Sequence, residues 1–371
     1  MVHSNEKGYR NPLYFFGAAL FVSCCFWLFP GSVFAYNLSD SNFTVTTGTH
    51  GEISSLKLTG DTYPTDYVMN AINAPNQNTA DHQWLGELMF TYRLGTGAWN
   101  TAWTSKSADG RTQSQSGNTV TVSYQNSSNS NGIRNFKVDE TYSLTGGALQ
   151  WSIKVTNTST QTLEIGDFGL PLPFNEYWSG GNGEEIYETR VLNHSFVGNN
   201  SSYITVQRPS GIGPFLLMVP DSTTGAGFEY QDRWRIEEHP GSMWAMEQGG
   251  WTEGLNVYYI HSNVIKSTNR GYLPNTSLTL TAGASKTYTF KFFKVANDAA
   301  VKDVLYNEGL IDVSVIPGMI VPTNQTAKFD LHTAKTITSI TAQYPSETTI
   351  TSLGTVGTNH KIYQLTMSHL G

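Results

Sequence analysis

The sequence has only two cysteines, Cys24 and Cys25, and both lie within its first 35 residues. The remaining chain of about 336 residues can form no disulfide, so its fold must be stabilised by a hydrophobic core alone, for which this length is ample. Histidines are scattered, with no His-x-x-x-His pair, and no Asp-x-Asp-x-Asp-Gly loop is present. The sequence therefore predicts no metal site and no cofactor.

Three further motifs are absent: a Gly-x-Ser-x-Gly nucleophile turn, a glycine-rich phosphate loop and any run of basic residues. The net charge is −7, or −8 without residues 1–35, and only 14% of the residues are charged. Nucleic acid and anionic membrane are therefore excluded as main partners. A surface of small polar residues favours an extracellular protein that binds neutral ligands.

The N-terminus has the pattern of a secretory signal peptide. Lys7 and Arg10 precede an apolar run over 13–29, and 33–35 (Val-Phe-Ala) supplies a cleavage site before Tyr36. We therefore expect a signal peptide over 1–35, an extracellular location and no membrane attachment after cleavage. An uncleaved N-terminal anchor is the alternative, although the run is short for a membrane span.

Alternating apolar residues predict strands over most of the chain. The predicted strands are 53–58, 120–124, 135–144, 149–157, 163–172, 255–261 and 287–295. Turns at 145–147 (Thr-Gly-Gly) and 282–284 (Ala-Gly-Ala) predict two long hairpins. Stacking such strands in two sheets would bury their apolar faces, which predicts an all-β fold with one large antiparallel β-supersandwich over 36–296.

One helix is predicted behind this domain, over 297–310, with an Asn or Asp cap and a terminating glycine. Short strands are predicted next, at 311–315, 326–331, 336–342 and 361–366. These strands are too few to close a sandwich. The region 311–371 is therefore interpreted as a small, incomplete β-sandwich-like domain that is truncated.

Two segments combine aromatic residues with hydrogen-bonding groups. Residues 228–253 and 173–220 hold most of them, and flat aromatic faces can stack on sugars while carboxylates and arginines bind hydroxyls. Tryptophan more often fills a core, which remains the competing interpretation. The predicted sugar-binding residues are Glu176, Trp178, Tyr230, Arg233, Trp234, Trp244, Trp251 and Glu253.

Catalytic residues are not assigned by the sequence. Glycoside cleavage requires two carboxylates at a set separation of about 5 Å or more, and the ten candidate carboxylates chosen between 176 and 253 show no pattern that pairs them. His194, Ser195 and Arg208 are further candidates for ligand contact. For Arg208 a structural ion pair is an equal alternative.

Several blocks carry a resemblance to a known group of proteins. They read HGEISSLKLTGD, DHQWLGELMFTYR, GDFGLPLPFNEYW and LTLTAGASKTYTFKFFKV. The chain resembles the N-terminal half of an uncharacterised family of large secreted proteins. That family is similar in layout to carbohydrate-active enzymes that join a galactose-mutarotase-like β-supersandwich to an (α/α) toroid. The resemblance implies that the catalytic carboxylates lie on the toroid, which this chain lacks.

Three functions follow from these observations. The leading hypothesis is the noncatalytic, sugar-contacting N-terminal portion of a secreted, glycoside hydrolase-like, polysaccharide-active enzyme, with a polysaccharide or oligosaccharide as partner. A self-sufficient glycoside hydrolase or lyase, with its carboxylates in 176–253, is the first alternative. An extracellular structural or adhesion protein is the second.

Overall fold

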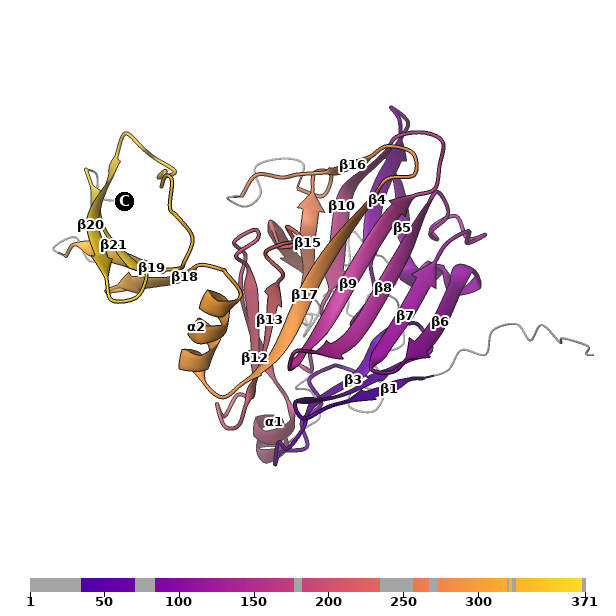
Figure 1. Cartoon of the computed structure of the whole chain (residues 1–371), viewed down its shortest axis with the longest axis horizontal. Helices are drawn as coiled ribbons and strands as arrows, with labels where there is room; N and C mark the ends of the chain where they lie inside the picture. The colour runs from indigo at the N-terminus through magenta and orange to yellow at the C-terminus, as the bar shows by residue number, and fades with distance from the viewer. Residues whose placement is uncertain are drawn as a thin grey trace, which may run out of the picture. The chain divides into compact units, whose positions relative to one another are not determined.

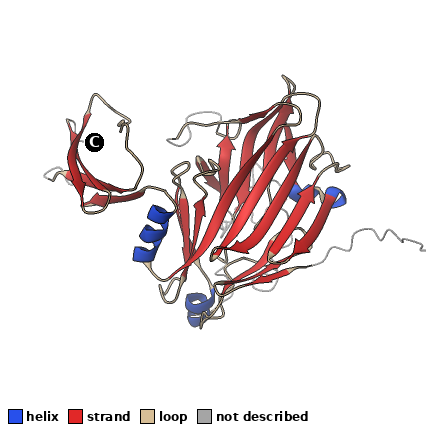
Figure 2. Cartoon of the chain, viewed as in Figure 1, coloured by secondary structure: helices blue, strands red, loops and turns tan. Residues whose placement is uncertain are grey.

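Antiparallel strands are the predominant regular elements of the computed structural model, which confirms the predicted all-β fold (Figure 2). The structure describes residues 35–70, 84–176, 182–233, 256–266, 273–318, 320–321 and 325–368. Two large sheets form the β-sandwich of the chain (Figure 1).

The larger sheet has eight strands in the order β11-β12-β13-β17-β9-β8-β7-β6. Its strands are β6 (Arg111–Ser116), β7 (Thr119–Tyr124), β8 (Phe136–Thr145), β9 (Ala148–Asn157), β11 (Leu192–Phe196), β12 (Tyr203–Gln207), β13 (Phe215–Pro220) and β17 (Ser285–Val295). Two short 3₁₀ turns, Thr104–Lys106 and Ala108–Gly110, precede β6.

The second sheet has six strands, with the path β14-β15-β10-β4-β5 and β16 paired to β10. Its strands are β4 (Met89–Leu94), β5 (Asn100–Trp103), β10 (Leu163–Pro171), β14 (Tyr230–Arg233), β15 (Asn256–Ser262) and β16 (Leu278–Leu280). A three-stranded sheet of β1 (Asn37–Ser39), β2 (Phe43–Thr47) and β3 (Ile53–Leu58) adds its inner side chains to the same core.

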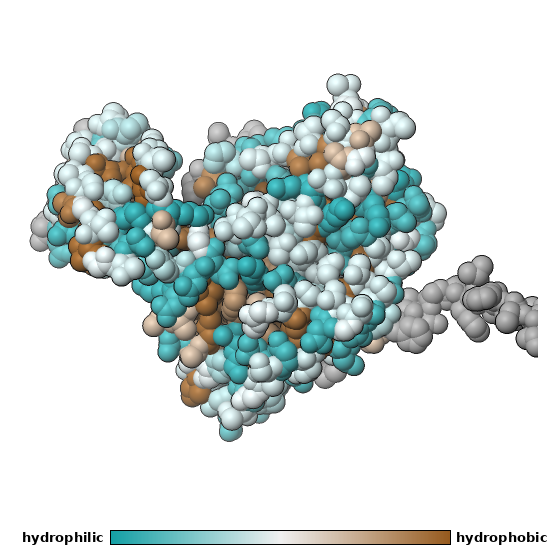
Figure 3. Space-filling view, in the orientation of Figure 1, coloured by the Kyte–Doolittle hydropathy of each residue, from teal (hydrophilic) through white to brown (hydrophobic). Residues whose placement is uncertain are grey.

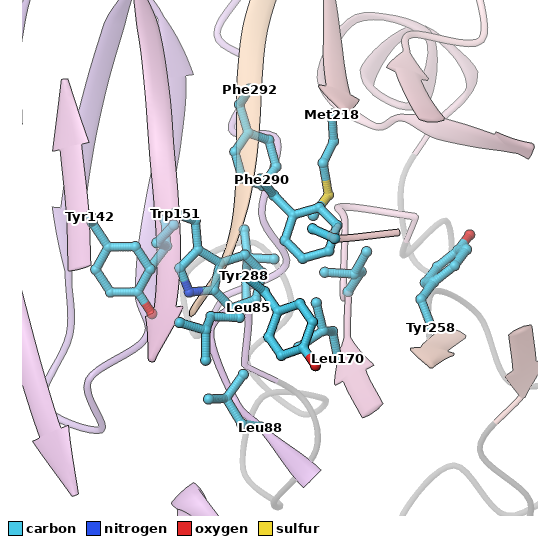
Figure 4. Close-up of a cluster of buried hydrophobic side chains, with 14 of the residues drawn as sticks. Leu85, Leu88, Tyr142, Trp151, Leu170, Met218, Tyr258, Tyr288, Phe290 and Phe292 are labelled. Carbon is cyan, nitrogen blue, oxygen red and sulfur yellow. The ribbon is translucent and has the colours of Figure 1, made fainter. Parts of the chain in front are cut away.

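The main core lies between the six- and eight-stranded sheets. Aromatic contacts join them: Phe90 of β4 meets Phe136 of β8 at 5.3 Å between ring centroids, and Phe168 of β10 meets Tyr288 of β17 at 5.7 Å. Figure 4 shows the middle of this core, with Trp151 among Tyr142, Phe290 and aliphatic side chains. Burial of this much apolar surface is what holds together a sandwich without disulfides.

The predicted hairpin at 145–147 is confirmed. β8 and β9 pair along their whole length and are joined by Gly146 and Gly147, with φ of 60° and 79°. Positive φ at both central residues is the signature of the type I′ turn, and glycine adopts it without steric strain.

The second predicted hairpin is wrong. Residues 281–284 do turn, but β16 pairs with β10 of the six-stranded sheet, while β17 pairs with β9 and β13 of the other. Asn157 holds the crossing, because its Nδ2 donates to the carbonyls of Gln161 (2.7 Å) and Leu280 (2.9 Å). The chain therefore changes sheets at this turn instead of folding back on itself.

The predicted helix is α2 (Asp298–Asn307), capped by the Asn297 side chain, which accepts a hydrogen bond from the Ala300 amide. A helix that the sequence analysis did not predict, α1 (Gly183–Thr189), begins at an Asn182 cap. The four-stranded sheet that follows α2 in the sequence has the order β18-β19-β21-β20. Its strands are β18 (Asp312–Ile316), β19 (Ala327–His332), β20 (Thr348–Val356) and β21 (His360–Met367).

The strand predicted at 336–342 is also wrong, since these residues form no regular element and β20 takes the place in the sheet instead. No residue of β20 or β21 is buried. Figure 3 accordingly shows hydrophobic colour where Figure 1 draws this sheet, and Ile316, Val356 and Met367 are among the exposed apolar residues. Across the described ranges, no helix has the length and apolar character that a membrane span requires.

Candidate functional site

Most of the predicted sugar-binding residues lie outside the described residues. These are Trp178, Trp234, Trp244, Trp251 and Glu253. Arg233 is described through its backbone, which pairs with Asn256 at the end of β14. Glu176 and Tyr230 can be placed in full, and both lie near the adjoining edges of the two large sheets.

Glu176 ties the loop after β10 to the edge strand of the other sheet. Its Oε1 accepts a hydrogen bond of 2.6 Å from the backbone amide of Asn193 in β11. The Asn193 side chain in turn accepts from the hydroxyl of Tyr258 in β15, at 3.3 Å. Burial raises the pKa of Tyr258, and the nearby charge of Glu176 raises it further, so this hydroxyl keeps its proton.

One more contact joins the sheet edges, and a second extends it within the six-stranded sheet. The Ser195 hydroxyl of β11 donates to Oε1 of Gln231 in β14 (2.9 Å), and Nε2 of Gln231 donates to Oδ1 of Asn256 (3.2 Å). We call this set the polar margin, which consists of Glu176, Asn193, Ser195, Gln231, Asn256 and Tyr258. Glu176 and Ser195 were predicted from the sequence, but the other four were not, because nothing in their local sequence marks them.

Tyr230 combines packing with a hydrogen bond. Its side chain is 9% exposed and its ring packs at 5.8 Å from that of Tyr259, in a small apolar cluster with Met69 and Met89. The hydroxyl donates to Oδ2 of Asp232 at 2.8 Å. Tyr230 is therefore fixed in place, and the part that remains accessible lines the hollow described next.

A hollow of about 880 Å³ adjoins the polar margin. Ser195 and Gln231 contribute polar groups to it, while Phe196, Tyr230 and Leu273 contribute aromatic and aliphatic surface. Its size falls in the range of small-molecule sites, about 300–1,000 Å³. Apolar walls with a few neutral hydrogen-bonding groups suit a ligand that has both C–H faces and hydroxyls.

Glu229 also lines this hollow, but its carboxylate is already committed. Oε1 accepts from the Ser262 hydroxyl (2.7 Å) and from the Thr276 amide (2.8 Å), and Oε2 accepts from the Thr276 hydroxyl (2.7 Å). The side chain is 4% exposed. These three hydrogen bonds fix the orientation of the carboxylate within the protein.

The Thr276 hydroxyl determines the state of His261. Because it donates its proton to Glu229, it accepts from Nδ1 of His261 (2.7 Å), and Nε2 then accepts from the Tyr288 hydroxyl (2.6 Å). Burial lowers the pKa of His261 to about 4, helped by the charge of Lys286, so the imidazole is neutral at physiological pH. A continuous chain of hydrogen bonds thus links Glu229, which lines the hollow, to His261 and Tyr288.

Arg208 is a structural residue. Its side chain is fully buried and pairs with Asp61, while Nε donates to the Thr65 hydroxyl (2.7 Å) and Nη1 donates to the Ile212 carbonyl (2.9 Å). The structure thus decides the alternative that the sequence left open. Across the described ranges, no group of three or more His, Cys, Asp and Glu is arranged to hold a metal ion.

Comparison with known proteins places this geometry among sandwich folds. A family model described as "Family of unknown function (DUF5695)" matches residues 50–371. A solved structure titled "Polysaccharide Lyase BACCELL_00875" is similar, with a TM-score of 0.58 and 16% identity over 90% of this chain. The chain spans 42% of the length of that structure. No curated protein matches the sequence.

Smaller sandwich proteins give weaker likenesses. A galactose mutarotase related enzyme from Lactobacillus acidophilus has a TM-score of 0.45 and 11% identity over 71% of this chain and 99% of its own. A GalM/aldose epimerase homologue from C. elegans has a TM-score of 0.41 and 10% identity over 72% of this chain and 100% of its own. The predicted resemblance to a galactose-mutarotase-like sandwich in an uncharacterised family is confirmed.

Proposed function

This chain belongs to the DUF5695 family of unknown function, and we propose that its sandwich is the noncatalytic, sugar-contacting portion of a secreted polysaccharide-active protein. The observation that carries the proposal is the hollow beside the polar margin. It offers the hydroxyl of Ser195 and the amide of Gln231 next to the ring of Tyr230. Hydroxyl and amide groups match sugar hydroxyls, which both donate and accept, and an aromatic ring matches the C–H face of a sugar.

The noncatalytic part of the proposal is supported by the state of the nearby carboxylates. Glu176 accepts a backbone amide, Glu229 accepts three hydrogen bonds, and Asp232 accepts from Tyr230. Glycoside cleavage needs an acid and a base on opposite sides of the bond, free to exchange protons with it. Carboxylates engaged in this way stabilise the fold, so we assign the chemistry to another part of the protein.

The binding prediction concerns Gln231. Replacing Gln231 with alanine is expected to weaken oligosaccharide binding about three- to tenfold, the range for loss of one ordinary hydrogen bond. Isothermal titration calorimetry of the full chain with neutral plant, fungal and bacterial oligosaccharides measures this. The matched control is Gln161→Ala, which removes an exposed glutamine distant in sequence from the margin.

Two outcomes would contradict the proposal. Equal oligosaccharide affinity of Gln231→Ala and Gln161→Ala would show that the polar margin does not bind sugar. Steady release of reducing sugar by the purified chain would show that it is a self-sufficient enzyme, and the noncatalytic assignment would be wrong.

Export is proposed on the signal-like N-terminus. Cleavage before Tyr36 would leave β1, which begins at Asn37, intact, together with the backbone bond from the Thr47 amide to the Tyr36 carbonyl (2.9 Å). We expect protein recovered from culture medium to begin at or near Tyr36, as read by N-terminal sequencing. Recovery of chains that begin near Met1 in the membrane fraction would favour an anchor instead.

A further inference from the structure

A second hollow, of about 340 Å³, lies elsewhere on the sandwich and shares no lining residue with the first. Lys57 of β3 lines one part of it, and the segment after β3 contributes Asp66 and Asn70. Helix α1 and the residue after it contribute Glu185, Thr189 and Arg190, and Asn175 joins them from the loop after β10. Three segments distant in sequence thus meet around one polar hollow.

The walls of this hollow are held by buried hydrogen bonds. Asn175, which is 1% exposed, donates through Nδ2 to the carbonyls of Asp66 (3.0 Å) and Thr189 (3.1 Å). The Asp66 carboxylate accepts from the Leu56 amide (3.0 Å) and from the Ser55 hydroxyl (2.6 Å). The lining is therefore preorganised, and a ligand would not have to order it.

The charges around the hollow balance. Lys57 and Arg190 supply two positive groups, and Asp66 and Glu185 supply two negative ones. Nη2 of Arg190 lies 3.0 Å from Oε1 of Glu185, whose side chain is 44% exposed. Such a site attracts neither an anion nor a cation strongly, but it presents both donors and acceptors.

Two buried atoms of the lining residues lack partners among the described residues. Oδ1 of Asn175 accepts no hydrogen bond, and Nε of Arg190 donates none, although both residues are more than nine-tenths buried. Buried polar groups are nearly always paired, with water or a ligand where protein groups are missing. Within the described residues, this wall therefore has hydrogen-bonding capacity that protein groups leave unused.

We propose that this hollow is a second carbohydrate subsite, which binds one neutral, polyhydroxylated sugar unit through hydrogen bonds. The proposal rests on the proposed function, because the sugar would belong to the same polysaccharide. A sugar hydroxyl accepts from Lys57 or Arg190 and donates to Glu185, so balanced charges suit it better than they suit a charged ligand. The lining includes no aromatic side chain, so recognition here depends on hydrogen bonds and not on stacking.

The test uses two variants with matched controls in the full chain. Lys57→Gln removes an exposed ammonium group, and its control is Lys154→Gln on β9, which is also exposed. Glu185→Gln removes the exposed carboxylate, and its control is the neighbouring Glu184→Gln. Each pocket variant is expected to weaken binding of a neutral oligosaccharide about tenfold, the lower end of the range for a hydrogen bond to a charged group, and each control to leave it unchanged.

Hydrogen–deuterium exchange locates the ligand independently of the variants. A neutral gluco-, galacto- or xylo-oligosaccharide is expected to protect amides over 183–190 and 64–70, while an oligogalacturonate of equal length protects them less. The free monosaccharide is the second arm, and it should give the same pattern at higher concentration. Glu185→Gln also removes the ion pair with Arg190 and could prevent folding. In that case the binding result for Lys57→Gln alone tests the proposal.

The outcomes separate this inference from the proposed function. Protection at 192–196 and 230–232 without protection at 183–190 would overturn the second subsite and leave the proposed function standing. Protection at 183–190 alone, with unchanged oligosaccharide affinity in Gln231→Ala, would support the second subsite. It would also show that the polar margin does not bind sugar. Stronger protection by the oligogalacturonate would overturn the neutral ligand, and protection in neither region would overturn both proposals.

Discussion

Replacing Glu140 with glutamine is expected to give a protein whose stability no longer falls as the pH rises from 6 to 9. Glu140 is fully buried in β8, where its Oε2 accepts hydrogen bonds from Nε1 of Trp151 (2.8 Å) and from the Tyr142 hydroxyl (3.0 Å). Oε1 has no partner among the described residues. The amide of glutamine has the shape of the protonated acid and can keep both bonds.

The direction in which stability changes with pH follows from the pKa of Glu140. Burial raises this pKa from 4.5 to about 8, against the lowering effect of the two hydrogen bonds, and the charge of Glu87 raises it further. The folded protein therefore holds a proton that the unfolded chain releases above pH 4.5. The resulting stability is fully present below about pH 4.5 and is lost as the pH rises through about 8.

Urea unfolding followed by circular dichroism at pH 6 and pH 9 measures this effect. From pH 6 to pH 9, the unfolding free energy of the wild-type chain should fall by on the order of 2–3 kcal/mol more than that of Glu140→Gln. Asp303→Asn, at an exposed position of α2, is the matched control and should keep the wild-type dependence. If Glu140→Gln also kept the wild-type pH dependence of stability, that dependence would come from other groups.

Replacing Arg208 with methionine is expected to lower the unfolding free energy by about 3–5 kcal/mol, the range for breaking a buried ion pair. The change leaves the Asp61 carboxylate, 4% exposed, without its cation. It also removes the guanidinium from the ring of Tyr63, 4.6 Å away, and its bonds to Thr65 and to the Glu188 carbonyl. Denaturant unfolding at neutral pH measures the loss.

A double variant distinguishes lost charge pairing from lost packing. Arg208→Met with Asp61→Asn should recover part of the stability, because no unpaired charge is then buried. Arg134→Met, at an exposed position, is the control and should change stability by about 0.5 kcal/mol or less. No recovery in the double variant would mean that the hydrogen bonds and packing of Arg208, and not its charge, account for the effect.

Local patterns were sufficient to predict the long strands. β3, β8, β9 and β17 alternate apolar and polar residues, and alternation is a direct consequence of side chains pointing to opposite faces of a strand. The Gly146-Gly147 turn was predictable for the same reason, since it depends on two adjacent residues. Helix α2 carried its cap and its apolar stripe in the sequence. The sequence also carries a cap for α1, Asn182 followed by Glu184 and Glu185, so this helix was predictable as well.

Sequence alone could not decide which strands pair. The turn at 281–284 has the composition of a hairpin, but β16 binds β10, more than one hundred residues earlier. Likewise the segment 336–342 has strand-like residues but no pairing partner, and β20 binds β21 instead. A strand is stabilised by backbone bonds to its neighbour, and the identity of that neighbour is a property of the whole fold.

The sequence by itself determined that this is an all-β protein with no disulfide available to the sandwich, because composition and alternation are local properties. It also marked Glu176, Tyr230 and Arg208 as candidates for ligand contact. Only the tertiary structure decided their roles: Glu176 joins two sheet edges, Tyr230 lines a hollow, and Arg208 neutralises a buried carboxylate. Partners such as Thr65 and Arg208 are separated by 143 residues, so their hydrogen bond exists only once the chain has folded.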